Sequence, residues 1–169
     1  MALATHYRTA RLVLRPVAAS DESDIVAAIN DLDVSGWLST VPYPYSVADF
    51  RFFLSEIAKP GETFVILDAQ GVAGVVGLED GELGYWLAPR AQGLGYATEA
   101  CRALLAAHFA TAAEAFVAGY FEGNVRSARV LEKLGFIETV RRPRQCKALG
   151  MDRPHVDLLL TREAFLSAN

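Results

Sequence analysis

Hydrophobic and polar residues alternate with a period of two over residues 11–17, and this alternation predicts a first β-strand. Ser20 follows, and beyond it Ile25 and Ile29 recur at the spacing of one helix face. Serine is a favoured N-cap because its hydroxyl accepts a hydrogen bond from an unpaired N–H of the first turn. We therefore expect a helix that begins at Ser20.

The next stretch, residues 30–45, follows neither period and contains several aromatic residues and prolines, so it predicts irregular structure. Ser46 and Asp49 then stand three residues apart, as in a capping box, ahead of apolar residues at helical spacing. Pro60 and Gly61 are typical of the end of a helix. A second helix is predicted between these two signals.

Three apolar stretches follow at short intervals, over residues 63–67, 72–78 and 82–87, and each predicts a strand. The connections at residues 69–71 and 80–81 are short and contain glycine. Connections of this length join strands as hairpins. The three strands are therefore expected to form an antiparallel meander.

A predicted helix over residues 97–110 and a predicted buried strand over residues 115–121 come next. A strand, a helix and a strand in this order imply a right-handed crossover and a parallel strand pair. A parallel pair added to the meander gives a mixed sheet.

The C-terminal part predicts a helix over residues 124–134, with Gly135 at the position of a helix stop. Residues 136–140 and 155–160 are interpreted as two closing strands, and residues 141–154 between them as a long polar loop. Neither a repeat nor a linker interrupts the pattern. We therefore expect one domain over residues 1–169.

The turn before the predicted helix 97–110 contains Gln92-Gly93-Leu94-Gly95-Tyr96-Ala97. A glycine turn at a helix N-terminus presents unpaired N–H groups, which are suited to bind a phosphate. Thr98 stands where a dinucleotide fingerprint requires a third glycine, and no lysine follows as in a P-loop. A tight turn without a ligand is the structural alternative.

A second motif opens the next helix, with Asn124 and Ser127 in the spacing Asn-x-x-Ser and Glu-Lys-Leu-Gly-Phe at residues 132–136. The structural alternative is that Asn124 is an N-cap, Ser127 a first-turn residue and Gly135 a helix stop. Each motif follows a predicted strand and opens a predicted helix, in the same order along the chain.

On these two motifs the chain resembles the GNAT-superfamily N-acetyltransferases, and most closely their Rim-type branch of ribosomal-protein N-terminal acetyltransferases. The resemblance implies an α/β (α+β) fold: a mixed, mainly antiparallel sheet of six to seven strands, helices on both faces and a splayed parallel pair. It implies acetyl-CoA as cosubstrate, with the pantetheine arm on one splayed strand and the pyrophosphate on the glycine turn. The cofactor-binding residues so implied are Trp86, Leu87, Gln92, Gly93, Leu94, Gly95, Tyr96, Ala97, Thr98, Asn124 and Ser127.

The same resemblance implies direct attack of a primary amine on the thioester, with Ser127 as the acid that protonates the leaving thiolate. In this branch the serine replaces a tyrosine that other members place near the sulfur. Glu82 is the candidate base, although a water chain or a merely solvated glutamate are alternatives. The acceptor is a peptide N-terminus or a small molecule, and a non-catalytic acyl-CoA-binding module is the rival from another class.

The region between the first two helices is the candidate wall of the acceptor pocket, with a satellite hydrophobic cluster as the alternative. Its residues are Trp37, Pro42, Tyr43, Pro44 and Tyr45.

The composition and the residue spacings argue against several classes of partner. The net charge is −4 and no basic stretch is dense, so nucleic acid is not expected as a partner. We expect no metal site, because His6, His108 and His155 lack ligand spacing, and no membrane segment, because no apolar window is long enough. Cys101 and Cys146 do not form a disulfide framework, which indicates a cytoplasmic setting. A homodimer is compatible with the resemblance.

Overall fold

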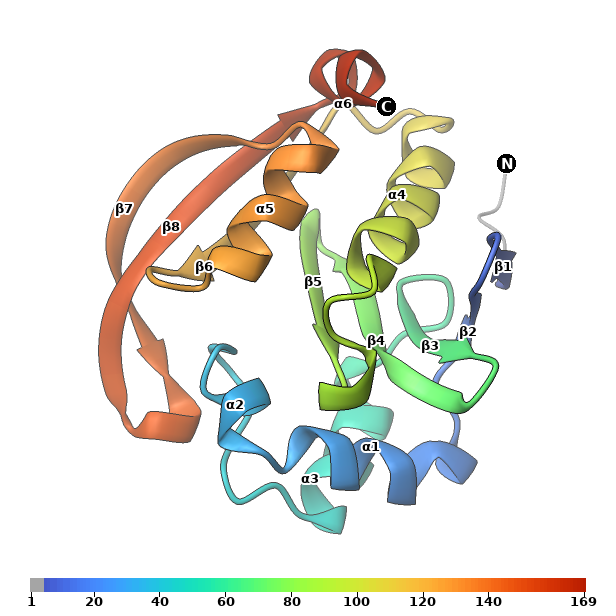
Figure 1. Ribbon diagram of the computed structural model, residues 1–169, viewed down its shortest axis with the longest axis vertical. Helices are drawn as coiled ribbons and strands as arrows, with labels where there is room; N and C mark the ends of the chain where they lie inside the picture. The colour runs from blue at the N-terminus through green and yellow to red at the C-terminus, as the bar shows by residue number, and fades with distance from the viewer. Residues whose placement is uncertain (1–4) are drawn as a thin grey trace.

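Eight strands form one open sheet in the order β1-β2-β3-β4-β5-β6-β8-β7 in the computed structural model, which describes residues 5–169 (Figure 1). The strands are β1 Tyr7–Arg8, β2 Val13–Pro16, β3 Thr63–Asp68, β4 Gly71–Glu79, β5 Glu82–Leu87, β6 Ala115–Phe121, β7 Ile137–Cys146 and β8 Met151–Thr161. All neighbours are antiparallel except β5 and β6, which are parallel. The mixed, mainly antiparallel sheet is as predicted.

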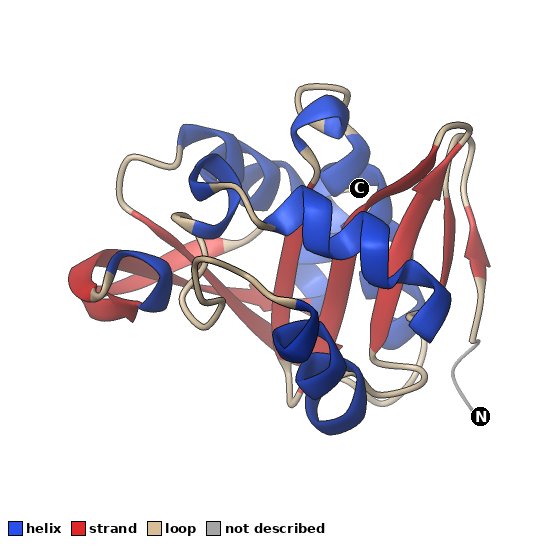
Figure 2. Cartoon of the chain, turned by 90° about the horizontal axis from the view of Figure 1, so that it is seen from below, coloured by secondary structure: helices blue, strands red, loops and turns tan. Residues whose placement is uncertain are grey.

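Helices cover the sheet on both sides, as the view from below shows (Figure 2). The helices are α1 Glu22–Ile29, α2 Leu32–Ser35, α3 Val47–Phe52, α4 Tyr96–Phe109, α5 Val125–Leu134 and α6 Arg162–Ala168. Single turns η1 Ala19–Asp21, η3 Pro89–Ala91 and η4 Lys147–Leu149 are 3-10, and a π-turn, η2 Phe53–Ile57, extends α3. One core cluster packs under α4 and α5, and a second packs under α1 and α3.

The parallel pair is joined at one position only. Glu82 of β5 pairs with Val117 of β6, and no further pair is registered between these strands. On its other edge β5 is paired with β4 over its whole length. Beyond the Glu82–Val117 pair, residues 83–87 of β5 and 118–121 of β6 therefore run without sharing ladder hydrogen bonds. We call this stretch the strand divergence, and it is the predicted splay.

The local predictions were confirmed where the sequence carries a backbone signal. The three-stranded meander is present as β3, β4 and β5. Ser46 and Asp49 form the expected capping box at the start of α3. Asn124 caps α5, and Gly135 ends it with φ 98°.

Two predictions were wrong: the residue that caps the first helix and the number of strands in the sheet. Ser20 does not cap the first helix but lies inside η1, and Asp21 occupies the N-cap position of α1. Asp21 is held there by Arg15, whose guanidinium is 2.7 Å from its carboxylate, and the sequence period does not show this contact. The sheet has eight strands instead of six to seven, because short β1 joins the edge.

The predicted polar loop at residues 141–154 was also wrong. These residues continue β7 and β8 as a long hairpin that is closed by η4. Strand β7 lies at the sheet edge and is exposed along nearly its whole length, so its outward residues are polar and no alternation marks them. Pro143 lacks an N–H, which an edge strand tolerates.

Candidate active site

The glycine loop, residues 92–95, connects η3 to the N-terminus of α4. Gly93 has φ 77° and Gly95 has φ 80°, a left-handed conformation that residues with a Cβ rarely adopt. Gly95 is the N-cap of α4 and supplies no side-chain acceptor for the first turn. Among residues 5–169, nothing accepts a hydrogen bond from the N–H groups of Gly93, Leu94 or Gly95. These donors, together with the dipole of a fourteen-residue helix, form a site suited to a phosphate.

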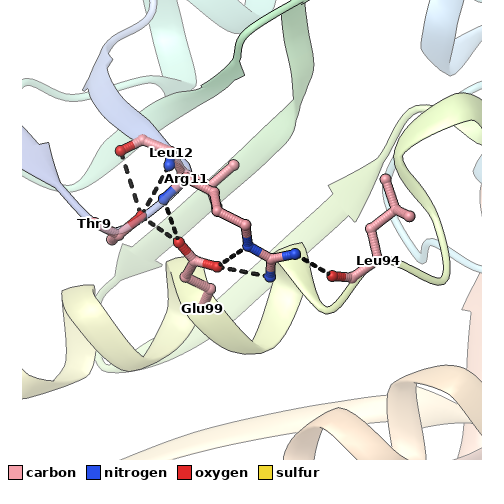
Figure 3. Close-up of polar contacts among 5 residues, drawn as sticks. All are labelled: Thr9, Arg11, Leu12, Leu94 and Glu99. Atoms are coloured by element: carbon pink, nitrogen blue, oxygen red, sulfur yellow. Dashed lines mark hydrogen bonds and ion pairs between the residues drawn. The ribbon is translucent and has the colours of Figure 1, made fainter.

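An arginine from the N-terminal segment holds this loop from outside (Figure 3). Arg11 donates from Nη1 to the carbonyl oxygen of Leu94 at 2.8 Å and forms an ion pair with Glu99 at 2.7 Å. Its guanidinium also lies 4.8 Å from the centre of the Tyr96 ring. Partial burial works against ionisation of Glu99, but hydrogen bonds from Thr9 and Arg11 outweigh it and lower the pKa of this carboxyl. The loop is therefore tied at its apex to the first turn of α4.

Gln92 connects the loop to both neighbouring elements. Its Nε2 donates to the carbonyl oxygen of Leu87 at 3.2 Å, and its Oε1 accepts a hydrogen bond from Arg126 on α5. Gln92 thus shapes the loop through its side chain and spans the ends of β5 and α5. Arg90 is occupied elsewhere, with Asp68 at 2.8 Å.

Ser127 and Asn124 lie at the start of α5, beside the strand divergence. The Oγ atom of Ser127 is 2.7 Å from the hydroxyl of Tyr85 on β5, and either hydroxyl can donate. The Oδ1 atom of Asn124 accepts from the backbone N–H of Ser127 at 3.2 Å, which fixes the first turn. Burial raises the pKa of Tyr85, so its hydroxyl stays protonated and remains a donor. The two hydroxyls therefore bridge β5 and α5.

Glu82 faces the other side of the sheet. Leu83 and Tyr85 belong to the core under α4 and α5, so alternation along β5 directs Glu82 and Gly84 toward α1 and α3. The Glu82 carboxylate accepts from Arg144 Nη1 on β7 at 3.2 Å, and its side chain is half exposed. The structure thus places the two predicted catalytic residues, Ser127 and Glu82, on opposite faces of β5.

A cavity of about 500 Å³ opens on the Glu82 face. Its floor includes Gly77 and Gly84, which are cross-strand partners and expose bare backbone to the cavity. This glycine pair lies between two other cross-strand pairs of the floor, Glu79 with Glu82 and Val75 with Trp86. The remaining walls are mostly apolar and come from α1, α3, η2 and the segment between α1 and α3. They are Ile25, Ile29, Leu38, Val41, Pro42, Tyr45, Phe52, Phe53 and Ile57.

The predicted acceptor wall is only partly as expected. Pro42 and Tyr45 line the cavity. Trp37, Tyr43 and Pro44 are not among its lining residues. Trp37 instead lies under the guanidinium of Arg153, 4.5 Å from its ring centre.

Sequence reasoning missed the roles of Tyr85, Arg11 and Arg144. Tyr85 stands inside a predicted strand, where an aromatic residue is read as core. Arg11 and Arg144 meet their partners only through contacts distant in sequence, for which the chain carries no local signal. Cys101 and Cys146 are both buried and free, and Cys101 belongs to the core under α4 and α5.

Within the described chain, no three His, Cys, Asp or Glu side chains are grouped so that they could hold a metal ion. None of the helices within residues 5–169 is long and apolar enough to cross a membrane.

Known structures share this fold. Ribosomal-protein-S5-alanine acetyltransferase from Vibrio fischeri superposes with a TM-score of 0.76 at 20% identity, over 96% of this chain and 99% of that one. Spermidine N-acetyltransferase from Vibrio cholerae, in complex with CoA and spermine, gives 0.78 at 21% identity over 94% and 99%. Mycobacterium smegmatis RimJ, in complex with CoA-disulfide, gives 0.74 at 22% over 93% and 88%. At these identities the likeness shows the fold.

The family assignment rests on the sequence. The acetyltransferase (GNAT) domain family matches residues 11–137, which is most of the chain. No curated protein matches it significantly. Together with the strand divergence and the open N–H groups of the glycine loop, this match shows that the chain belongs to the GNAT acetyltransferases and is an acetyl-CoA-dependent N-acetyltransferase.

Proposed function

We propose that this enzyme acetylates the α-amine of a peptide or protein N-terminus, as a member of the Rim-type branch. The observation that carries the proposal is the position of the cavity, which opens on the face of β5 opposite Ser127. An amine bound there approaches the thioester from one face while the leaving sulfur lies toward the other. RimJ and the S5-alanine acetyltransferase are among the structural neighbours.

Acetyl-CoA supplies the acetyl group, and the chain offers groups that fit its two polar parts. The N–H groups of residues 93–98 serve the pyrophosphate, with the positive end of α4 behind them. The pantetheine arm runs along the divergent edge of β5, where the backbone of Trp86 and Leu87 has no β6 partner. Gln92 and Asn124 support this path by ordering the loop and the first turn of α5.

Ser127 donates a proton to the thiolate as the carbon–sulfur bond breaks. The Tyr85 hydroxyl, 2.7 Å away, donates a hydrogen bond to the Ser127 oxygen and stabilises its developing negative charge until solvent returns the proton to Ser127. Burial raises the pKa of Tyr85, so its hydroxyl keeps its own proton and stays a hydrogen-bond donor.

Glu82 accepts a proton from the incoming ammonium, directly or through one water. It lies at the edge of the cavity and at the root of the strand divergence. Arg144 orients the carboxylate through a contact of 3.2 Å. The carboxylates of Asp49, Glu79 and Asp80 also line the cavity and favour a cationic acceptor.

The same acidic lining supports a second candidate, a small amine. A spermidine N-acetyltransferase is among the neighbours, and the cavity has the size of a small-molecule site. The two kinds of acceptor differ in length, because a bound peptide would continue out of the cavity whereas a small amine would lie within it.

Thiol release from acetyl-CoA, measured with N-terminal peptides of ribosomal proteins beside a panel of small amines, tests the proposal. We expect kcat/KM to be highest for peptides, and an N-terminally blocked copy of the best peptide to be inactive. A higher value for small amines would transfer the assignment to the second candidate. Coenzyme binding without thiol release to any amine would indicate a non-catalytic acyl-CoA-binding module.

A further inference from the structure

Gly84 lies in the middle of β5, on the floor of the cavity, and the fold does not require glycine there. Its φ lies outside the left-handed region, and a Cβ added to it would meet no atom of the described chain within 4 Å, its own chain neighbours aside. The pairing of β5 with β4 runs without a register shift from Glu82 to Leu87, so no bulge accounts for the residue. Neither backbone strain nor packing within the chain therefore explains this glycine.

The other glycines inside strands have structural reasons. Gly71 has φ 115°, which residues with a Cβ rarely adopt. At Gly74, Gly77 and Gly119 a Cβ would come to 3.2 Å or less from a neighbouring atom. Glycine inside a strand destabilises it relative to alanine, and it often marks a place where a ligand approaches the backbone closely. Gly84, on the floor of a cavity and unexplained by the fold, fits such a place.

Gly84 also lies beside the groups that handle the coenzyme sulfur. The next residue, Tyr85, belongs to the core on the other face, and its hydroxyl is 2.7 Å from Ser127 Oγ. The registered pairing of β5 with β6 is confined to Glu82, so the Gly84 backbone borders the strand divergence. Of the two cavity residues that flank Tyr85, Trp86 carries a large side chain and Gly84 carries none. The open floor next to the divergence is therefore at Gly84.

We propose that Gly84 is a specificity-determining residue of the acceptor site, which leaves room for a substituent on the carbon that bears the amine. The inference rests on the proposed function and deepens it, because every amino acid except glycine carries a side chain on that carbon. The carbon lies over Gly84, and its substituent extends along the floor toward Trp86. Glu82 is two positions away on the same face, about 6.6 Å along the strand, so its carboxylate can reach the amine.

Two other roles of Gly84 predict different behaviour. If the strand required glycine, Gly84→Ala would lower the melting temperature and reduce the turnover of all acceptors alike. If the coenzyme required it, the same substitution would raise the Kd for acetyl-CoA, as measured by calorimetry. In neither case would the choice between acceptors change. The acceptor site predicts an unaltered Kd, a melting temperature no lower than that of the wild type and a changed choice.

The experiment uses two pairs of acceptors, each of which differs by one methyl group on the carbon that bears the amine. The pairs are a peptide that begins with alanine beside the same peptide beginning with glycine, and isopropylamine beside ethylamine. Thiol release gives kcat/KM for each acceptor. We expect the wild-type enzyme to use the methyl-bearing member of a pair at least as well as the other member.

The variants are Gly84→Ala and Gly84→Val in the full-length enzyme. One methylene group too many or too few in a pocket changes kcat/KM about 10–200-fold, so we expect Gly84→Ala to lower the ratio within a pair about 10-fold. Gly84→Val should lower it further. Ala115→Val is the matched control, because it adds methyl groups to an exposed residue of β6 that does not line the cavity. Its ratios should equal those of the wild type.

Three results would overturn the proposal. They are unchanged ratios in both folded Gly84 variants, equal losses for the two members of each pair, and a wild-type enzyme that rejects the methyl-bearing members. The proposed function is tested separately by comparing the peptides with the small amines in the wild type. Because the ratio within a pair can be measured with either class of acceptor, a preference for small amines would refute the peptide assignment and still test Gly84.

Discussion

Arg11→Ala tests whether the glycine loop is held ready for the coenzyme by the N-terminal segment. The substitution removes the ion pair with Glu99 and the hydrogen bond to the Leu94 carbonyl oxygen (Figure 3). It leaves the fold intact because Arg11 lies outside the strands, between β1 and β2. The loop should then sample conformations in which its N–H groups no longer converge.

The structure sets the expected size of this effect. The Arg11 side chain is 48% exposed, so its ion pair is worth about 0.2–1 kcal/mol after solvent screening. The charged hydrogen bond to Leu94 is worth at most about 1.5–3 kcal/mol, and about 1 kcal/mol after the same discount. The sum is roughly 1–2 kcal/mol. Since about 1.4 kcal/mol is tenfold in affinity, the Kd for acetyl-CoA should rise about 5- to 30-fold.

Isothermal titration calorimetry with acetyl-CoA measures this Kd, and steady-state kinetics give kcat at saturating coenzyme. We expect kcat to change little, because the polar contacts of Arg11 are with Glu99 and Leu94 and not with Ser127 or Glu82. Arg51→Ala is the control, since it removes an exposed ion pair between Arg51 on α3 and Glu22 on α1 without touching the loop. Arg11→Lys retains the charge but not the forked geometry of the guanidinium. A Kd within twofold of wild type for Arg11→Ala would refute the reasoning. Wild-type affinity in Arg11→Lys would show that the positive charge alone, and not the positioning of the loop, accounts for the effect of Arg11.

Three further substitutions test the rest of the site. Gly95→Val places a branched Cβ at φ 80° and only 3.4 Å from Arg11, so acetyl-CoA binding should weaken strongly, as measured by calorimetry; unchanged affinity would exclude this loop as the phosphate site. Ser127→Ala should lower kcat and kcat/KM together by about 10²-fold with coenzyme affinity retained, whereas a purely structural serine would change only the melting temperature. Glu82→Gln should slow turnover more at pH 7 than at pH 9, where the amine is already neutral; a uniform loss across the pH range would make Glu82 a structural residue.

Much of the fold follows from short-range signals in the sequence. The connections between β3, β4 and β5 are short, so the strands can only pair as hairpins. The positive φ of Gly95 and Gly135 and the N-cap at Asn124 each involve a few neighbouring residues. Such signals predicted where the glycine loop and α5 begin. The same reasoning placed the first helix cap at Ser20 incorrectly, because the distant ion pair of Arg15 with Asp21 decides that turn.

The hairpin of β7 and β8 shows how an exposed edge hides a strand. Alternation arises only when one face of a strand is buried, and β7 has solvent on nearly every residue. Its polar residues were therefore interpreted as a loop. The consequence for function is large, because Arg144 lies on this hairpin and the interpretation as a loop gave it no fixed position.

The sequence by itself determined the family, the order of the core strands and the two motifs that open α4 and α5, because backbone sterics and capping act over a few residues. Only the tertiary structure decided which side chains meet: Tyr85 with Ser127 across 42 positions, Glu82 with Arg144 across 62 and Arg11 with Glu99 across 88. These contacts depend on the packing of α4 and α5 and on the divergence of β5 from β6, and neither leaves a periodic trace in the chain. The physical reason is that side-chain pairing between distant segments is set by the sheet order, which no local propensity encodes.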